Sequence, residues 1–490
     1  MNTLPRTNPL SGKAGLIGVG HSTYWAQFDG LLDEMHRKLG VLEERLQGHG
    51  LDVVNFGMID DAASTYAIIP RILAEDIDVL YIDMVTYATS STFGIICREI
   101  KVPIVLVALQ PLTAMDYPNG TTYMQLCNDD FCSVPEFTGV AIRMGRGAPP
   151  VILGHEENDP VAEADLACWA GITHALHDLR KGRIGLMGHV LESMLDMHCD
   201  PTAVTSAFGC HVPLIEPDLL LKFYESADEK RVEKWKNDIR EFFDTPDPES
   251  DPLTEKLTEK DLHTAARSAV ALEELIREKD LTGLAYYYEG NEGTTMRTVM
   301  TNLIVGNSLL TGGGFPMCGE FDIKTCIAML IMDRLGIGGS FAEFHPVDFK
   351  EGTVLVGHDG PHHINIADGK PVLRSLKKYH GKPGSGASVE FRLKEGPITM
   401  LSVGQKNGGE FKFVVAEGQS ERRPIPPTGN TNTHGRFGPD VRKFLLDWVA
   451  AGPTHHFALG TGHHAKAIEW IADALGIECE VIRRESPVEA

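Results

Sequence analysis

The sequence predicts an α/β protein in which two Rossmann-like domains with parallel sheets precede a third domain that contains a small antiparallel β-barrel. Up to about residue 335, apolar strands alternate with helical segments, and the strands are apolar on both faces. This pattern is typical of a parallel sheet that helices cover on both sides. Beyond that point, short strands separated by turns take over, as in an antiparallel barrel.

The first predicted domain, 1–179, opens with a strand at Ala14–Gly20. Apolar residues then recur every three or four positions from Phe28 to Leu46, which predicts an amphipathic helix. Thr23 stands where the G-x-G-x-x-G pattern has its third glycine, so we expect no dinucleotide site. Further strands are expected at Leu51–Phe56, Ile77–Met84 and Val102–Leu109, and a helix from about Pro160 to Leu179.

The second predicted domain, 180–335, begins with a strand at Arg183–His189. Thr258-Glu259-Lys260-Asp261 is a capping box, which predicts the start of a helix that lasts to about Lys279. We also expect strands at Val204–Gly209 and Gly283–Tyr288, and helices at about Lys230–Phe243, from Thr294 to about Ile304, and at Ile323–Leu335.

The third predicted domain, 336–490, contains the barrel. Lys406-Asn407-Gly408-Gly409 predicts a hairpin turn between its last two strands. The barrel strands are expected at Thr353–His358, His363–Asp368, Ser388–Leu393, Pro397–Gln405 and Glu410–Gln419. The chain then returns to α/β structure, with helices at Pro439–Ala450 and Ala465–Leu475 and strands at His455–Gly460 and Ile477–Ile482.

Composition limits the classes of partner. The net charge of −23 disfavours nucleic acid or an anionic membrane, because phosphate groups would be repelled. The longest apolar run, Cys326–Met332, is too short to span a bilayer, and no signal-peptide pattern is seen at the start. Nine cysteines, an odd number without a C-x-x-C pair, argue against a disulfide framework or a zinc ribbon. We therefore expect a cytoplasmic protein.

Two glutamates follow successive breaks in the second domain and are the first candidates for chemistry. Glu292 follows the strand at Gly283–Tyr288, and Glu320 ends the loop TGGGFPMCGE. Their separation of twenty-eight positions lets the chain cross by a helix and return beside its starting point, so both can face one cleft. Such a pair can share a divalent cation, act as general acid and base, or do both. Solvated loop glutamates are the alternative.

Histidines gather in the last third of the chain. His358 closes one strand and the His455-His456 pair opens another, so two imidazoles can converge on the two glutamates. Two carboxylates and two imidazoles suit a divalent ion such as Mn²⁺, although zinc is possible. Singly, each histidine is more often structural.

Polar residues at strand ends in the first domain are candidates for binding a polar ligand. They are His21, Gln110 and Asn128. Ordinary loop polarity explains each of them equally well.

The ordered set of segments N-E-G-T, F-P-M-C-G-E-F, V-L-V-G-H, T-H-H-F-A-L and G-I-E-C-E-V-I resembles the L-arabinose isomerase family and its more distant L-fucose isomerase relatives. The resemblance extends from Leu16 to Ile482. It implies three domains, Mn²⁺ or another divalent cation, and a homo-oligomer, trimer or hexamer, with active sites near subunit interfaces.

Carried over residue by residue, the resemblance implies that Glu292, Glu320, His358 and His456 are metal ligands. His456 is preferred to His463 because it keeps register with the closing helix and strand. The sequence also departs from the family. Thirty-eight positions separate Glu320 from His358, more than the arabinose enzymes use, and the segment E-D-Y-T-Y-H typical after the second glutamate is missing. The identity of the sugar is therefore open.

The chemistry that the resemblance implies is aldose–ketose isomerisation of an open-chain sugar through a cis-enediolate. A proton leaves C2 and one is delivered to C1, with Glu292 and Glu320 as the acid–base pair and a metal that stabilises the developing charge. A hydride shift is the mechanistic alternative. Alternative functions are a related metal-dependent epimerase, an isomerase of a substituted or larger sugar, and a non-enzymatic sugar-binding protein.

Overall fold

The computed structural model describes residues 4–247, 249–250, 254–255, 257–376, 378–379, 382–383, 386–426 and 428–483. These residues form two compact units. The first is Leu10–His177, and the second takes the described residues before Leu10 and after His177. No helix in these ranges combines the length and the apolar character that a membrane crossing requires. The predicted division of residues 180–490 into central and C-terminal domains stays a prediction.

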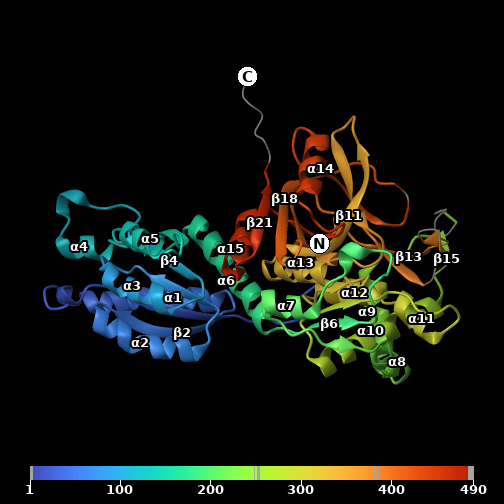
Figure 1. Ribbon diagram of the computed structural model, residues 1–490, viewed down its shortest axis with the longest axis horizontal. Helices are drawn as coiled ribbons and strands as arrows, with labels where there is room; N and C mark the ends of the chain where they lie inside the picture. The colour runs from blue at the N-terminus through green and yellow to red at the C-terminus, as the bar shows by residue number, and fades with distance from the viewer. Residues whose placement is uncertain are drawn as a thin grey trace. The chain divides into compact units, whose positions relative to one another are not determined.

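The first unit is built on a five-stranded parallel sheet in the order β2-β1-β3-β4-β5 (Figure 1, blue to cyan). The order is that of a doubly wound sheet, because the chain crosses back over β1 before it continues outward. The strands are β1 (Lys13–Val19), β2 (Asp52–Ile59), β3 (Val79–Asp83), β4 (Ile104–Gln110) and β5 (Val151–His155).

Helices alternate with these strands and bury their apolar sides in two separate clusters. One cluster combines residues of α2, α3 and α5 with the sheet, and the other gathers around α1 and α4. Asp61 begins α2 with a capping box, in which its side chain accepts a hydrogen bond from the Ser64 amide. The helices are α1 (Leu31–Gly48), α2 (Ala62–Glu75), α3 (Ser90–Glu99), α4 (Thr122–Cys127), α5 (Val134–Arg143) and α6 (Pro160–Lys181).

The second unit contains a four-stranded sheet in the order β10-β9-β6-β7, which is parallel throughout. Its strands are β6 (Ile184–Met187), β7 (Leu214–Ile215), β9 (Gly283–Tyr286) and β10 (Met317–Cys318). The predicted capping box is present, since the Thr258 side chain accepts from the Asp261 amide at the start of α10. The accompanying helices are α7 (Pro201–Phe208), α8 (Pro217–Glu225), α9 (Glu229–Phe242), α10 (Glu259–Lys279), α11 (Thr295–Thr301), α12 (Ile304–Gly312) and α13 (Ile323–Arg334).

A closed antiparallel barrel of six strands completes the second unit (Figure 1, orange to red). Its order is β17-β20-β11-β12-β19-β18, and pairing of β18 with β17 closes it. The predicted hairpin turn at Lys406–Gly409 joins these two strands, and Gly408 and Gly409 have φ of 96° and 88°. The strands are β11 (Gly338–Asp348), β12 (Thr353–His358), β17 (Gly396–Gln405), β18 (Phe411–Glu421), β19 (Thr431–Arg436) and β20 (Phe457–Thr461).

Helix α13 contacts both β9 of the parallel sheet and strands β11, β17 and β20 of the barrel. Every one of its residues is buried, because the two layers cover it from opposite sides. A last strand, β21 (Glu478–Ile482), pairs in parallel with β18, and α14 (Val441–Ala450) and α15 (Ala465–Leu475) precede it. This architecture confirms the predicted fold class.

Three predicted elements are wrong. Val204–Gly209 lies in helix α7, which the Asp200 side chain caps and Pro201 opens, rather than in a strand. His363–Asp368 contains a short 3-10 helix, η4 (Ile364–Ile366). Ser388–Leu393 contributes only to β16 (Ala387–Glu390), which pairs outside the barrel with β13 (Val372–Leu376). Strand β11 was not predicted, because glycines at its start and an irregular alternation obscure its pattern.

Candidate metal and active site

Three neighbouring barrel strands bring polar side chains to one end of the barrel. His358 is the last residue of β12, and His456 immediately precedes β20. Strand β11 lies between them and places Glu343 opposite Gly357 and Ala342 opposite Phe457. Because neighbouring strands lie about 4.8 Å apart, this register sets Glu343 between the two histidines.

Glu320 reaches the same place from the loop that follows β10. Glu320 and Phe321 both have positive φ, at 60° and 61°, a backbone conformation that costs free energy in residues other than glycine. The Phe321 amide donates a 2.9 Å hydrogen bond to the carbonyl of Tyr286 at the end of β9, which anchors the loop. Strained backbone held in this way is typical of functional sites.

The four side chains approach one another closely. Nε2 of His358 lies 3.8 Å from Oε1 of Glu320 and 4.0 Å from Oε1 of Glu343. Nε2 of His456 lies 3.7 Å from Oε2 of Glu320. The donor atoms of Glu320, His358 and His456 all lie within 4.8 Å of one another, as do those of Glu343, His455 and His456. Carboxylate oxygens and imidazole nitrogens at this spacing can share one divalent cation.

Hydrogen bonds at Nδ1 turn Nε2 of both imidazoles toward the cluster. Nδ1 of His358 donates to the carbonyl of Asp359 at 2.6 Å, and Nδ1 of His456 donates to Oδ2 of Asp322 at 3.1 Å. Asp322 is fully buried and also accepts from the amide and the hydroxyl of Thr325. Partners of this kind fix the tautomer and orientation of metal-binding histidines. The ring of Phe341 packs against both imidazoles at 4.3 Å.

Burial sets the protonation of the cluster. It raises the pKa of Glu320 and lowers the pKa of His358 well below its usual value. Burial also opposes protonation of His456, but the hydrogen bond and charge of Asp322 raise the pKa of this imidazole overall. Oε2 of Glu320 is buried and has no hydrogen-bond partner in the described part of the chain. A cation would satisfy this oxygen and the free Nε2 atoms, so the residues present fit a metal ion.

The cluster forms one wall of a cavity of about 480 Å³. Another part of the cavity is lined by residues of β9 and the 286–289 segment, of α11 and α12, and of the 386–388 segment. Arg297 is among them; its guanidinium donates to the Gly290 carbonyl at 3.1 Å and lies 3.9 Å from Glu289. The cavity therefore offers acidic, cationic and apolar surface beside the cluster.

Residues 338–478 match the model of the L-arabinose isomerase C-terminal domain. The chain is 26% identical over 341 residues to the L-arabinose isomerase of Thermotoga maritima, an alignment that covers 68% of this chain and 66% of the relative. It is 23% identical over 363 residues to the L-arabinose isomerase of Geobacillus kaustophilus, covering 72% and 70% of the two chains. The chain is related to the L-arabinose isomerase family.

The alignment with the Thermotoga enzyme spans just under two thirds of that enzyme's length. Among solved structures, a solute-binding protein from Agrobacterium vitis bound with alpha-D-tagatopyranose matches 65% of this chain and 89% of its own, at 13% identity. Its TM-score of 0.16 is too low to bear on fold or function. The family relationship therefore depends on the sequence matches, which confirm the resemblance noted above and name an isomerase family.

The structure brings together three of the four side chains that the family resemblance pointed to: Glu320, His358 and His456. Glu292 is not among them. It is exposed in the loop before α11 and does not line the cavity. Glu343 occupies the place expected for it. The period of two in a strand puts Glu343 on the same face as Phe341, but only the pairing of β11 with β12 and β20 places that face beside the histidines.

Two other histidines of the C-terminal region, His455 and His463, are bonded to groups outside the cluster. His463 donates from Nε2 to the Gly418 carbonyl at 2.9 Å, away from the cluster. His455 lines the cavity, but its Nδ1 and its amide are both bonded to the Asp196 carboxylate. Of the two alternatives considered for the second histidine ligand, His456 is therefore the one that lies beside Glu320.

The polar residues predicted to bind substrate lie in the first unit. The Gln110 side chain donates to the Leu112 carbonyl, and the Leu112 amide donates to Oδ1 of Asn128 at 2.9 Å. These bonds join the end of β4 to the end of α4. His21 follows β1 and packs edge-on against Tyr24 with ring centroids 5.1 Å apart. Their role in binding a sugar stays a prediction.

Proposed function

We propose that this protein is a metal-dependent aldose–ketose isomerase that acts on an open-chain sugar through a cis-enediolate. The observation that carries the proposal is the convergence of Glu320, Glu343, His358 and His456 on one wall of a cavity. The relationship to the L-arabinose isomerases supports the same reaction.

The ion would be held by Glu320, Glu343, His358 and His456. Mn²⁺ is the best candidate for a set of two carboxylates and two imidazoles. When bound, the ion supplies electrostatic stabilisation for charge that develops on the substrate oxygens. Asp322 and the Asp359 carbonyl keep Nε2 of His456 and of His358 directed at the site.

Glu320 and Glu343 would serve as the acid–base pair, because both carboxylates line the cavity and lie within 4.0 Å of Nε2 of a histidine. Isomerisation removes the proton at C2 of the aldose and delivers a proton to C1, and transfer between the two oxygens accompanies it. Burial raises the pKa of Glu320, which brings this carboxyl nearer to the pH at which it can both hold and release a proton. Phe341 and the apolar part of the cavity would limit the access of water.

The test is a screen of pentoses, hexoses, deoxysugars and substituted sugars, with Mn²⁺ added or with a chelator, in D₂O. Ketose formation that requires the metal and introduces deuterium at the transferred position supports isomerisation through an enediolate. Ketose without deuterium would favour a hydride shift. Binding of a sugar without turnover, in a protein that holds no stoichiometric metal, would contradict the proposal and favour a binding protein.

A larger or substituted sugar is a second candidate substrate class. The cavity volume of about 480 Å³ lies in the range of pockets that enclose drug-sized ligands, and Arg297 lines it together with Glu289. An epimerase acting on such a sugar would use the same residues. The screen separates the two reactions, because an epimerase returns an aldose of changed configuration.

We also propose a homo-oligomer, trimer or hexamer, with active sites near subunit interfaces, from the family relationship. Light scattering of the purified protein measures this directly. A monomer with full activity would contradict it.

A further inference from the structure

The N-terminal segment of the chain packs within the second unit. The Leu4 amide donates to Oδ1 of Asn365 at 2.8 Å, and Nδ2 of Asn365 donates back to the Leu4 carbonyl at 3.1 Å. The Thr7 amide donates to the Gly313 carbonyl at 2.8 Å, and Nδ2 of Asn8 donates to the Gly314 carbonyl at 3.0 Å. Residues 4–8, called the strap here, are therefore fixed to the end of α12 and to the segment after His363.

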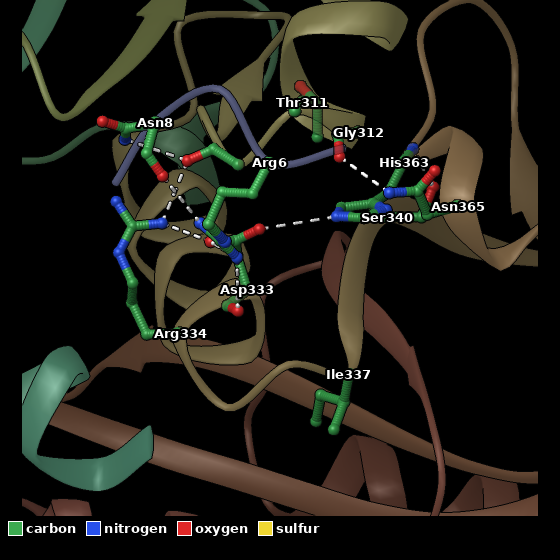
Figure 2. A network of polar contacts seen from close by, with 12 residues as sticks. Arg6, Asn8, Thr311, Gly312, Asp333, Arg334, Ile337, Ser340, His363 and Asn365 are labelled. Carbon is green, nitrogen blue, oxygen red and sulfur yellow. Dashed lines mark hydrogen bonds and ion pairs between the residues drawn. The ribbon is translucent and has the colours of Figure 1, made fainter. Parts of the chain in front are cut away.

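Arg6 binds a buried carboxylate at the centre of this region (Figure 2). Its Nη2 donates to Oδ2 of Asp333 at 2.8 Å and to the Asp333 carbonyl at 3.2 Å. Asp333 is 3% exposed and also accepts from Arg334. Gly314 passes so close that a Cβ there would overlap the Arg6 guanidinium, so the glycine makes room for this contact.

The other oxygen of Asp333 faces His363, which follows the candidate metal ligand His358 in the same segment of the chain. Oδ1 of Asp333 lies 3.6 Å from Nε2 of His363, which is 5% exposed. Among the residues that the structure describes, neither ring nitrogen of His363 has a hydrogen-bond partner. Asp333 is therefore the charged group against which the His363 imidazole is placed, and Arg6 and Arg334 hold Asp333 (Figure 2).

A directed chain of hydrogen bonds continues from His363 to His358. Each ring nitrogen of His362 has one polar neighbour, and a neutral imidazole has one donor and one acceptor nitrogen. Nε2 lies 2.8 Å from the His358 carbonyl and must donate, so Nδ1 accepts from the Ser340 hydroxyl at 2.9 Å. The Ser340 oxygen in turn accepts from the His363 amide at 3.2 Å.

We propose that Arg6 is a positioning residue: through Asp333 and His363 the strap fixes segment 358–365, and with it the imidazole of His358. The proposal rests on the proposed function for the role of His358 in metal binding. It explains why ionic groups occupy a place where apolar packing would be less costly. Groups that orient metal ligands from outside the ligand set typically change metal affinity by 10- to 100-fold when they are removed.

The test compares Arg6→Ala, Arg6→Lys and a matched control, Arg45→Ala. Arg45 also binds one carboxylate, Glu163, at 2.7 Å and one main-chain carbonyl, that of Glu156, at 3.2 Å, but it lies in the first unit. The dissociation constant for Mn²⁺ and the hydrogen–deuterium exchange of segment 358–367 are measured on the full chain. We expect about 10-fold weaker Mn²⁺ binding and faster exchange for Arg6→Ala. Arg6→Lys should recover part of both, and Arg45→Ala should change neither.

Unchanged Mn²⁺ affinity and unchanged exchange in Arg6→Ala would overturn the proposal. Ser340→Ala interrupts the same chain near its other end and replaces Arg6→Ala if that variant fails to fold. Where both fold, the double variant should lose less affinity than the two single losses combined, because the two residues act on one segment. If the losses of Mn²⁺ affinity in the two single variants add fully in the double variant, the proposal that both residues act on one segment is overturned. If the unmodified protein binds no Mn²⁺, the proposed function fails. The hydrogen–deuterium exchange of segment 358–367 in Arg6→Ala then tests by itself whether the strap fixes this segment.

Discussion

Asp322→Asn tests how the candidate metal site is held. Asp322 caps α13 and accepts hydrogen bonds from the Thr325 amide at 3.2 Å, the Thr325 hydroxyl at 2.7 Å and Nδ1 of His456 at 3.1 Å. Asparagine keeps nearly the same shape and one carbonyl oxygen. It removes the negative charge and replaces one acceptor with an amide group. The Thr325 amide loses its partner if that group takes the place of Oδ1, and the Thr325 hydroxyl and Nδ1 of His456 lose theirs if it takes the place of Oδ2.

The size of the effect follows from these contacts. A hydrogen bond to a charged group contributes about 1.5–3 kcal/mol, and loss of an orienting partner typically weakens metal binding 10- to 100-fold, or about 1.4–2.8 kcal/mol. Asp322 is also the group that raises the pKa of His456, so the pKa of this imidazole should fall in the variant. We expect weaker Mn²⁺ binding and lower turnover, with a moderate loss of stability.

Asp440→Asn is the control that separates helix capping from site geometry. Asp440 caps α14 and accepts from the amides of Arg442 and Lys443 at 2.9 and 3.1 Å, and no described histidine forms a hydrogen bond or ion pair with it. Calorimetric titration with Mn²⁺ and thermal unfolding are measured for both variants. If Asp322→Asn binds Mn²⁺ as tightly as the unmodified protein, the orienting role of Asp322 is refuted.

Three further predictions concern other parts of the chain. Glu343→Gln should abolish turnover and weaken Mn²⁺ binding at least 10-fold, whereas Glu292→Gln should keep near-normal activity. If a kinetic assay shows the reverse order, Glu292 rather than Glu343 is the second carboxylate of the acid–base pair. His456→Ala should weaken Mn²⁺ binding more than His463→Ala, since only His456 lies beside Glu320; equal titration curves would contradict this. Burial raises the pKa of Asp83 to about 8, from 3.8 in the unfolded chain. Between these values the folded state keeps a proton that the unfolded state has lost, so the free energy of unfolding should fall as pH rises from about 4 to 8, by at most about 1.4 kcal/mol per pH unit. Asp83→Asn should flatten this slope in denaturant titrations, and an unchanged slope would mean that Asp83 is ionised in the folded protein.

Much of the fold follows from local patterns. The spacing of apolar residues before Leu46 and the capping box at Thr258 predict α1 and α10 because helix period and caps are read directly from the sequence. Val204–Gly209 is apolar and β-branched enough to suggest a strand, but Asp200 and Pro201 start a helix there. Here the capping signal outweighs strand propensity.

The site was only partly predictable for a different reason. His358 and His456 stand at strand ends with clear patterns, and Glu320 ends a glycine-rich break, so each could be found locally. Glu343 lies inside β11, whose role depends on pairing with β12 and β20 far along the chain. Register between distant strands is a property of the folded barrel, and no local spacing in the sequence specifies it.

At Glu320 in the candidate site, several local features lower the stability of the folded state. Glu320 has a positive φ, an unpartnered buried oxygen and a pKa that burial raises, so each of these features disfavours the folded state at neutral pH. A glycine or an asparagine would suit the backbone at less cost. A ligand that binds only the folded state compensates for such costs, by about 2.7 kcal/mol at one hundred times its dissociation constant. The unfavourable local energy at Glu320 is therefore itself an argument that this carboxylate is kept for binding a cation.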